Sequence, residues 1–230
     1  MESQQKINVS LTKRQRELII GLLLGDGHLE KRPGGDTYRL RVEHSEAQKE
    51  YLFWIYNEFK EWVPSVPKQK VRSDGRISYE MVTVSHAAFH FYHGQFYVDG
   101  KKVIPKLLYK WMTPLVLAIW YMDDGSLKSI RHKTFNIHTL GYTKSDLDRV
   151  CMMFKKIFGI VAVLHSQKSV AWRIYITSES SELFTSLVYP TIKLIPSMLY
   201  KLKNTNAQIV TEGSQGRLVA NGNRDDSVMA

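Results

Sequence analysis

Two stretches of the chain, residues 18–24 and 115–122, are apolar at every position apart from one glycine. A helix that is apolar on every side is buried all round. Two such helices in one chain are expected to pack on each other at the centre of the molecule. Gly21 and Gly25 in the first of them would allow the two backbones to approach closely.

The residues before each apolar run are typical of helix starts. Thr12 and Gln15 have the spacing of a capping box, in which each side chain bonds the backbone of the other. Thr113 is a good N-cap, and Pro114 suits the first helical position. Each run ends near a glycine, a common helix terminator. The pattern therefore predicts two helices with well-defined beginnings.

The elements after each apolar helix are repeated along the chain. The matching segments are strand-like runs at 37–44 and 133–139, helices at 46–62 and 144–158, strand pairs at 68–84 and 161–177, and helices at 86–97 and 180–188. Residues 104–110 and 195–201 close the two copies with the same Ile, Pro, Leu, Tyr and Lys. The order α-β-β-α-β-β-α, run twice, predicts an α+β fold with antiparallel sheets. We expect one half at 1–110, a second at 111–203, and a polar, poorly ordered tail at 204–230.

The composition of the chain indicates what kind of partner it binds. The chain has 230 residues, 43% of them hydrophobic, and a formal net charge of +10. This excess favours a polyanion, with nucleic acid ahead of an anionic membrane surface. The single cysteine, Cys151, excludes an intrachain disulfide and a thiolate zinc cluster. The longest fully apolar run has eight residues, whereas a membrane-spanning helix needs about 20. We expect a soluble protein in a reducing compartment.

The acids at the ends of the two apolar helices are the candidate chemistry. Asp26 and Asp124 occupy equivalent positions, although a carboxylate at a helix C-terminus is disfavoured by roughly 0.3–1 kcal/mol. Asp-Gly is also an ordinary turn signal, but its repetition at equivalent places favours a functional site. A divalent cation would relieve the repulsion, and hard oxygen ligands favour Mg²⁺ or Ca²⁺. Asp123 has Gly25 as its counterpart, so no catalytic role is predicted for it.

Residues 19–27 and 117–125 resemble the two motifs of monomeric LAGLIDADG homing endonucleases, closest to the intron-encoded type with a Met-Asp-Asp-Gly second motif. The resemblance runs over residues 17–203. It implies two pseudo-symmetric αββαββα halves that pack through the motif helices, with antiparallel sheets forming a saddle in the major groove of DNA. It also implies that Asp26 and Asp124 bind the metal.

The same resemblance assigns two lysines to the catalytic site. Lys102 and Lys201 match the basic residues of such enzymes, near the closing segments of the two halves. The internal repeat aligns the chain differently, because it pairs Lys201 with Lys110 and places Lys193 near the equivalent of Lys102. Both alignments stay open at the level of the sequence.

Polar residues on the strands complete the expected site and its binding surface. Glu43 and His138 lie where the family has a polar residue that supports the metal ligands. A two-stranded ribbon fits the major groove, and basic residues on the hairpins are the candidate DNA contacts. They are Arg39, Arg41, Lys68, Lys70, Arg72, Arg76, Lys128, Arg131, Lys133, His165, Lys168 and Arg173. Alternation predicts Lys68, Lys70 and Arg72 on one face and Arg39 with Arg41 on another.

The resemblance implies an enzyme that cuts both strands of DNA at a specific site by metal-dependent phosphodiester hydrolysis, leaving staggered ends. The expected cofactor is Mg²⁺, with Mn²⁺ as a substitute. The expected partners are duplex DNA with a long asymmetric target and the chain's own intron RNA, and the expected state is a monomer. The compartment would be a bacterial or archaeal cytoplasm, a mitochondrion or a chloroplast. Two alternatives remain: an RNA maturase that assists intron splicing, and a non-catalytic DNA-binding protein of the same fold.

Overall fold

The computed structural model describes residues 10–129, 133–167 and 171–202. It contains two four-stranded antiparallel sheets with the same strand order, β1-β2-β4-β3 and β7-β8-β10-β9. The strands of the first sheet are β1 His28–Lys31, β2 Tyr38–Ser45, β3 Lys68–Val71 and β4 Ile77–Val82. Those of the second are β7 Gly125–Ser129, β8 Thr134–His138, β9 Ala162–Gln167 and β10 Ala171–Ile176. The repeated sheet order agrees with the predicted duplication.

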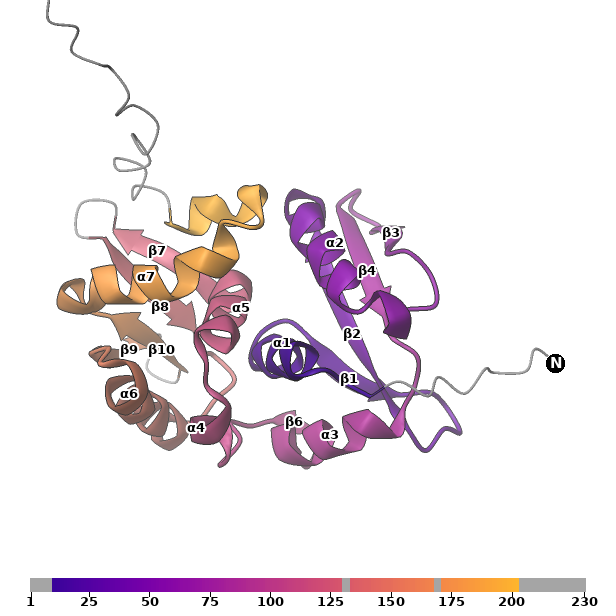
Figure 1. Cartoon of the computed structure of the whole chain (residues 1–230), viewed down its shortest axis with the longest axis horizontal. Helices are drawn as coiled ribbons and strands as arrows, with labels where there is room; N and C mark the ends of the chain where they lie inside the picture. The colour runs from indigo at the N-terminus through magenta and orange to yellow at the C-terminus, as the bar shows by residue number, and fades with distance from the viewer. Residues whose placement is uncertain (1–9, 130–132, 168–170, 203–230) are drawn as a thin grey trace, which may run out of the picture.

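The helices follow the same repeated order (Figure 1). They are α1 Lys13–Leu24, α2 Lys49–Glu58, α3 His90–Phe96, α4 Leu108–Trp111, α5 Pro114–Asp124, α6 Lys144–Phe158 and α7 Ser181–Ile192. A small hairpin, β5 Tyr97–Val98 and β6 Lys101–Lys102, links α3 to α4, and a 3₁₀ segment, Pro196–Leu202, comes after α7. The closing segments of the two halves, expected to be alike, therefore differ in structure. The predicted boundary at 110–111 falls inside α4, and the predicted tail lies outside the described residues.

Helices α1 and α5 begin as their sequences predict. At α1, Thr12 Oγ1 accepts from the Gln15 N–H at 3.1 Å, and Gln15 Oε1 accepts from the Thr12 N–H at 3.0 Å, so the capping box is complete. At α5, Thr113 Oγ1 accepts from the Val116 N–H at 3.2 Å, and Pro114 is the first residue of the helix. These caps fix where each helix starts.

The two helices lie side by side at the centre of the molecule, each belonging to a different half (Figure 1). Their approach depends on glycine. A Cβ atom placed on Gly21 would lie 2.6 Å from Ile119 Cβ, and one on Gly25 would lie 2.5 Å from Asp123 Cβ. Neither distance is compatible with a real side chain, so only glycine permits this spacing.

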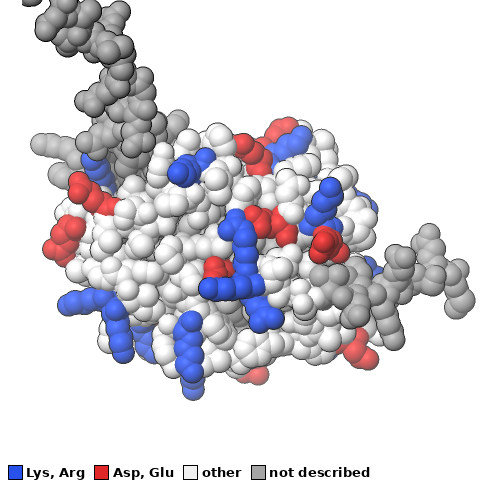
Figure 2. Space-filling model, in the orientation of Figure 1, with Lys and Arg blue, Asp and Glu red and all other residues white. Residues whose placement is uncertain are grey.

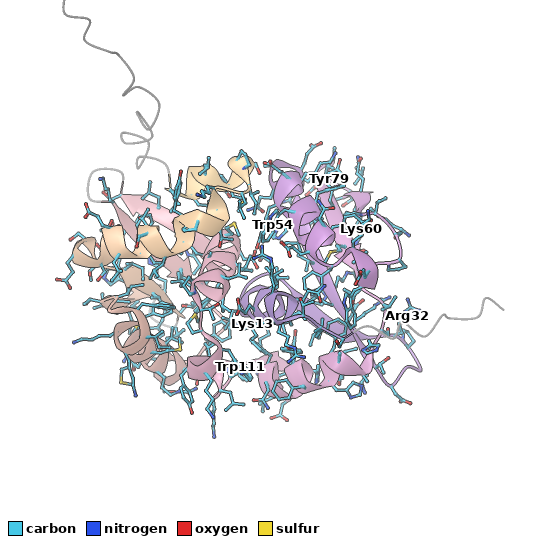
Figure 3. All side chains as sticks on the ribbon, viewed as in Figure 1. Lys13, Arg32, Trp54, Lys60, Tyr79 and Trp111 are labelled. Carbon is cyan, nitrogen blue, oxygen red and sulfur yellow. The ribbon has the colours of Figure 1, made fainter. Side chains whose placement is uncertain are left out.

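Each sheet has one face buried under helices and one open face. Leu40 and Val42 of β2 and Met81 of β4 point into the core of the first half, where α2 packs on the sheet. In the second half, α6 packs on β9 and β10. Trp54 points from α2 towards the centre, where the Arg14 guanidinium of α1 lies 5.6 Å from its ring (Figure 3). The alternation leaves the polar residues of the strands on the open faces.

The described helices are all too short or too polar to cross a membrane. The fold class predicted from the sequence, α+β with two similar halves, is confirmed.

The helix contact can be tested by Gly21→Ala. We expect the added methyl group to clash with Ile119 and to destabilise the protein by about 1–3 kcal/mol, the usual cost of overpacking a core. At about 2–4 °C per kcal/mol for a chain of this size, thermal unfolding will show it clearly. The matched control is Gly94→Ala on α3, where nothing lies within 4 Å of the added Cβ. An equal loss in both variants would contradict the role given to the close contact.

Candidate metal centre and nucleic-acid interface

Asp26 and Asp124 lie at the C-terminal ends of the two packed helices. The Asp26 side chain is 44% exposed, whereas Asp124 is half-buried and accepts a hydrogen bond from Trp120 Nε1 at 3.2 Å. Burial, with the charge of Asp26 as the next contribution, raises the pKa of Asp124 to about 7. The structure thus brings the two carboxylates into electrostatic contact, as the sequence predicted.

Asp123, for which the sequence predicted no catalytic role, holds the first motif in place. Its carboxylate is fully buried and packs where Gly25 has no side chain. Oδ2 accepts from the backbone N–H of Asp26 at 3.0 Å, and Oδ1 accepts from the Tyr51 hydroxyl at 2.9 Å. Burial, together with the charge of Asp26, raises its pKa well above the ordinary value. A residue of the second half therefore fixes the backbone that presents the acid of the first.

His44 is the functional neighbour that sequence reasoning missed. Its Nδ1 lies 3.6 Å from Asp26 Oδ2 and its Nε2 lies 3.8 Å from Asp123 Oδ1. The ring is buried, with the Gln48 side chain as a further polar neighbour. Burial lowers the pKa of the imidazole. The available signal was a histidine in the buried register of β2, after Leu40 and Val42.

Glu43, expected beside the metal ligands, lies on the open face of β2 instead. It accepts a hydrogen bond from Ser78 Oγ at 2.7 Å, away from the paired aspartates. His138 does lie at the site, because it lines the same hollow as Asp124 and its Nε2 is 3.0 Å from Ser126 Oγ. One of the two expected supporting residues is therefore near the carboxylates, and the other is not.

The two lysines take equivalent places beneath the helix ends. Lys102 Nζ donates to the carbonyl oxygens of Gly25 and Gly27, at 2.7 and 2.6 Å. In the second half, Lys201 Nζ donates to the carbonyl oxygens of Asp123 and Gly125, at 3.2 and 2.7 Å. The bonded carbonyls are counterparts in the two motifs. Burial lowers the pKa of both lysines, and the nearby aspartates oppose this effect.

This geometry decides between the two alignments of the repeat. Lys110 and Lys193, the partners suggested by the internal repeat, are exposed and lie beside the rings of Tyr109 and Tyr189. The lysines at the site are Lys102 and Lys201, although they occupy different positions relative to the Ile-Pro pairs of their halves.

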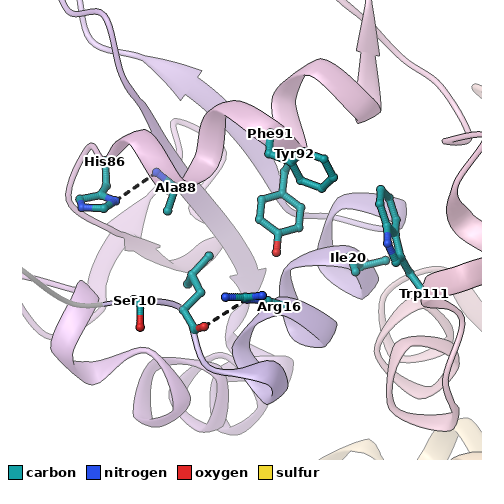
Figure 4. Close-up of a pocket in the computed structure, with 9 residues that line it drawn as sticks. Ser10, Arg16, Ile20, His86, Ala88, Phe91, Tyr92 and Trp111 are labelled. Carbon is teal, nitrogen blue, oxygen red and sulfur yellow. Dashed lines mark hydrogen bonds between the residues drawn. The ribbon is translucent and has the colours of Figure 1, made fainter.

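A hollow of about 480 Å³ opens beside the helix ends and is lined by Lys102, Asp124, His138 and Tyr142 among others. A larger hollow of about 580 Å³ lies elsewhere, between the start of α1, α3 and α4 (Figure 4). Phe91, Tyr92 and Trp111 line that second hollow, and it contains none of the paired carboxylates or lysines. The larger of these two hollows is therefore not the one beside the paired carboxylates.

The residues at the helix ends fit a divalent cation. Within the described ranges, Asp26, His44 and Asp123 are the one group of possible ligands whose atoms all lie within 4.8 Å of each other. Asp124 adds a further carboxylate, whose pKa is raised by burial and by the charge of Asp26. Carboxylate oxygens suit Mg²⁺ and Mn²⁺.

The candidate DNA contacts gather on the open faces of the sheets. Strand pairing places Arg41 opposite Val82, Glu43 opposite Glu80, and Glu80 opposite Lys68. Arg39, Arg41, Lys68 and Lys70 therefore share one face, and the prediction that the two arginines lie on a different face is wrong. The error came from treating the strands separately, because the register of β4 between them decides the face.

The remaining candidates divide between the sheets and the turns. Arg173 pairs with His138 and His165 on the open face of the second sheet, and Lys128 Nζ lies 4.2 Å from the Tyr175 ring. Arg72 and Arg76 lie at the β3–β4 turn, and Lys133 is exposed just before β8. Arg131 and Lys168 lie outside the described residues.

The basic residues are not gathered into one continuous patch on every face of the molecule. On the face shown in Figure 2, Lys and Arg are scattered among Asp and Glu on a largely uncharged surface. The basic residues of the open faces are thus the candidates for binding a polyanion.

Comparison with known proteins places these features in a family. A model of the "LAGLIDADG DNA endonuclease family" matches residues 16–184. The chain is 29% identical over 205 residues to the cytochrome b mRNA maturase bI2 of Debaryomyces hansenii, covering 86% of this chain and 76% of that protein. It is 28% identical over 216 residues to the DNA endonuclease I-ChuI of Chlamydomonas applanata, covering 86% and 98%. The solved structure of the homing endonuclease I-WcaI bound to its DNA recognition sequence is similar with a TM-score of 0.78 and 29% identity, covering 88% of this chain and 94% of that one.

The pKa of Asp124 makes the metal-free protein sensitive to pH. Because the folded-state pKa of about 7 exceeds the ordinary value of 3.8, the folded state binds more protons between these limits and its stability falls as pH rises. Asp124→Asn should therefore raise the melting temperature at pH 8 in EDTA by about 2–4 °C or more, and the gain should shrink as pH falls towards 4. Asp148→Asn on the surface of α6 serves as the control. A lower melting temperature for Asp124→Asn at pH 8 would contradict this account.

Proposed function

Because this chain belongs to the LAGLIDADG DNA endonuclease family, we propose that it is a homing endonuclease that hydrolyses both strands of duplex DNA at a specific site. One observation supports the proposal above all. Each of the two motifs ends in one acid, Asp26 or Asp124. The carbonyl oxygens of each motif accept hydrogen bonds from one lysine, Lys102 in the first and Lys201 in the second, so the site holds two equivalent sets. Two equivalent sets suit the cleavage of two strands.

In this proposal, Asp26 and Asp124 hold divalent metal, Mg²⁺ with Mn²⁺ as a substitute. When bound, such a cation supplies Lewis-acid stabilisation of the scissile phosphate and a more acidic water. The buried Asp123 and His44 act behind Asp26. Asp123 fixes the backbone N–H of Asp26, and His44 limits the orientations open to its carboxylate.

The lysines have a donor left for the substrate. A lysine ammonium has three N–H donors, and two of them on Lys102 bond the carbonyls of Gly25 and Gly27. The third is available to a water molecule or a phosphate oxygen. The same count applies to Lys201. Lys102 is half-buried and Lys201 is buried, and a positive charge held in place before the reaction stabilises the charge that develops on the phosphate.

The open faces of the two sheets supply the binding surface, and a long asymmetric target bound by a monomer is expected from two non-identical halves in one chain. A gene carried by an intron of an organelle, or of a bacterial or archaeal genome, fits this function. The proposed division of the chain is a first half at 1–110, a second half at 111–203 and a tail at 204–230.

A second function is favoured by one of the relatives. The protein of Debaryomyces hansenii is named as a cytochrome b mRNA maturase, so assistance in splicing of the chain's own intron RNA is the alternative. Splicing assistance needs a folded RNA-binding surface but no hydrolysis at the paired carboxylates. Asp26→Asn should therefore abolish DNA cleavage while leaving an in vitro splicing reaction unchanged if the chain has both activities.

The nuclease is tested on duplex DNA that carries the uninterrupted insertion site of the gene. With Mg²⁺, we expect both strands to be cut, and Asp26→Asn or Asp124→Asn to reduce double-strand cleavage to background. EDTA should abolish cleavage by the unmodified chain, and Mn²⁺ should restore it. Full cleavage by either variant would rule out the proposed metal ligands.

The lysines offer a matched comparison within the repeat. Lys102→Met and Lys201→Met should each lower the cleavage rate by about 10²–10³-fold, the usual effect of losing one preorganised electrostatic contact. Lys110→Met and Lys193→Met, at the positions that the repeat pairs with them, should leave the rate near that of the unmodified chain. Equal losses at all four positions would mean that the lysines act through general charge and not through the site.

A further inference from the structure

The two open faces differ in how their charge is arranged. The open face of the first sheet carries four basic residues, Arg39, Arg41, Lys68 and Lys70, and three acidic residues, Glu30, Glu43 and Glu80. The open face of the second sheet carries Lys128 and Arg173, and none of its four described strands contains an aspartate or a glutamate. The first face is thus rich in charge but nearly balanced, whereas the second is sparse in charge and purely positive.

The charges of the first face form one connected network. Glu30 accepts from Arg39 Nε at 2.8 Å and from Arg41 Nη1 at 3.2 Å. Glu80 bonds both Arg41 and Lys70. Glu43 lies 3.4 Å from Lys70 Nζ and 3.3 Å from Arg72 Nη2. The chain of contacts runs Arg39, Glu30, Arg41, Glu80, Lys70, Glu43, Arg72.

The network holds its members in defined positions. The glutamate side chains are only 11–28% exposed, so each is partly covered by its neighbours on the open face. Burial raises the pKa of Glu30, but hydrogen bonds from Arg39 and Arg41 outweigh it and the net pKa is lowered. A hydrogen bond from Ser78 likewise lowers the pKa of Glu43. Both stay ionised at neutral pH and act as acceptors only.

The second face leaves its cations without acidic partners. Lys128 Nζ lies over the Tyr175 ring, and in the described part of the chain neither Lys128 nor Arg173 forms an ion pair. The Arg173 Nε is buried without a hydrogen-bond partner. Burial, and after it the charges of Lys128 and Arg173, lower the pKa of the neighbouring His165.

The phosphates and the base edges of DNA bind different kinds of protein surface. A DNA phosphate offers acceptors only, so an ionised glutamate facing it is repelled. Base edges in the major groove offer both donors and acceptors, and glutamate accepts from the cytosine amine while arginine donates to guanine. An unpaired cation without a neighbouring acid suits phosphate, which contributes affinity without sequence information.

We propose that the two halves divide their work on DNA: the acid–base network of the first sheet discriminates the sequence of its half-site, and the uncompensated cations of the second sheet anchor the other half-site mainly through phosphates. Glu43 and Glu80 are the specificity-determining residues of the first half. This inference rests on the proposed function as a DNA-binding enzyme.

The test uses the full chain in EDTA, so that DNA is bound and not cut. Selection from a library of randomised duplexes gives the base preferences, and fluorescence anisotropy with a duplex of arbitrary sequence between 50 and 200 mM KCl gives the salt dependence. The unmodified chain should prefer defined bases more strongly in one half of its site. Failure to bind any duplex would overturn the proposed function itself, and the remaining outcomes concern the division of work.

The two sheets are then changed separately. In the variant Glu43→Gln with Glu80→Gln, base preferences should fall at least about fivefold in one half-site only, and binding to arbitrary sequence should become tighter. In the variant Lys128→Gln with Arg173→Gln, base preferences should stay as they are, and the slope of log K against log salt should fall by about 0.9 for each lost phosphate contact. Asp148→Asn on α6 is the control for a distant acid.

A further double variant separates the loss of the network from a change in net charge. Arg41→Gln with Glu80→Gln removes three ion pairs of the network, Arg41–Glu80, Arg41–Glu30 and Lys70–Glu80, without changing the net charge. It should therefore weaken base preferences and leave the salt slope unchanged. Thermal melting identifies variants that retain the fold. The proposal is overturned if a folded Glu43 and Glu80 variant keeps all base preferences, or if the Lys128 and Arg173 variant changes base preferences as much as it changes the salt slope.

Discussion

The contact between α1 and α5 is the constraint on which the rest of the molecule depends. Gly21 and Gly25 let the helices approach to a distance that no other residue would permit, and this approach brings the carboxylates at their ends together. Burial and the charge of Asp26 then raise the pKa of Asp124. The site is thus a consequence of helix packing, since two helices spaced by ordinary side chains would hold the same acids apart.

The two halves share a fold, but the carbonyl groups at their helix ends are bonded by residues from different parts of the repeat. Each motif leaves carbonyl groups at a helix end that need a donor, and a lysine supplies it in both cases. Lys102 reaches its carbonyls from a short hairpin, whereas Lys201 comes from a 3₁₀ segment. The lysine–carbonyl contacts of the two halves are therefore equivalent, although the lysines belong to different kinds of secondary structure.

The sequence was sufficient for the fold, since apolar runs, caps and the repeated order of elements all reflect local physics. It was sufficient to pair Asp26 with Asp124 because an unfavourable residue appeared twice at one place. It could not choose between Lys102 and Lys110, because that choice depends on how differently the closing segments fold. His44 was missed because its position was indistinguishable from the core register of β2. The shared face of Arg41 and Lys70 depends on strand pairing between residues far apart, which no local pattern encodes.

The side chain of Asp123 fills the space left by Gly25 and bonds the backbone of Asp26. This knob-and-hole relation is directional. Two copies of the second half would bring buried carboxylates against each other, and two copies of the first would face each other across a gap. A chimaera that joins one half of this chain to a half of another family member therefore keeps this contact only if both of its sides, Gly25 and Asp123, are matched.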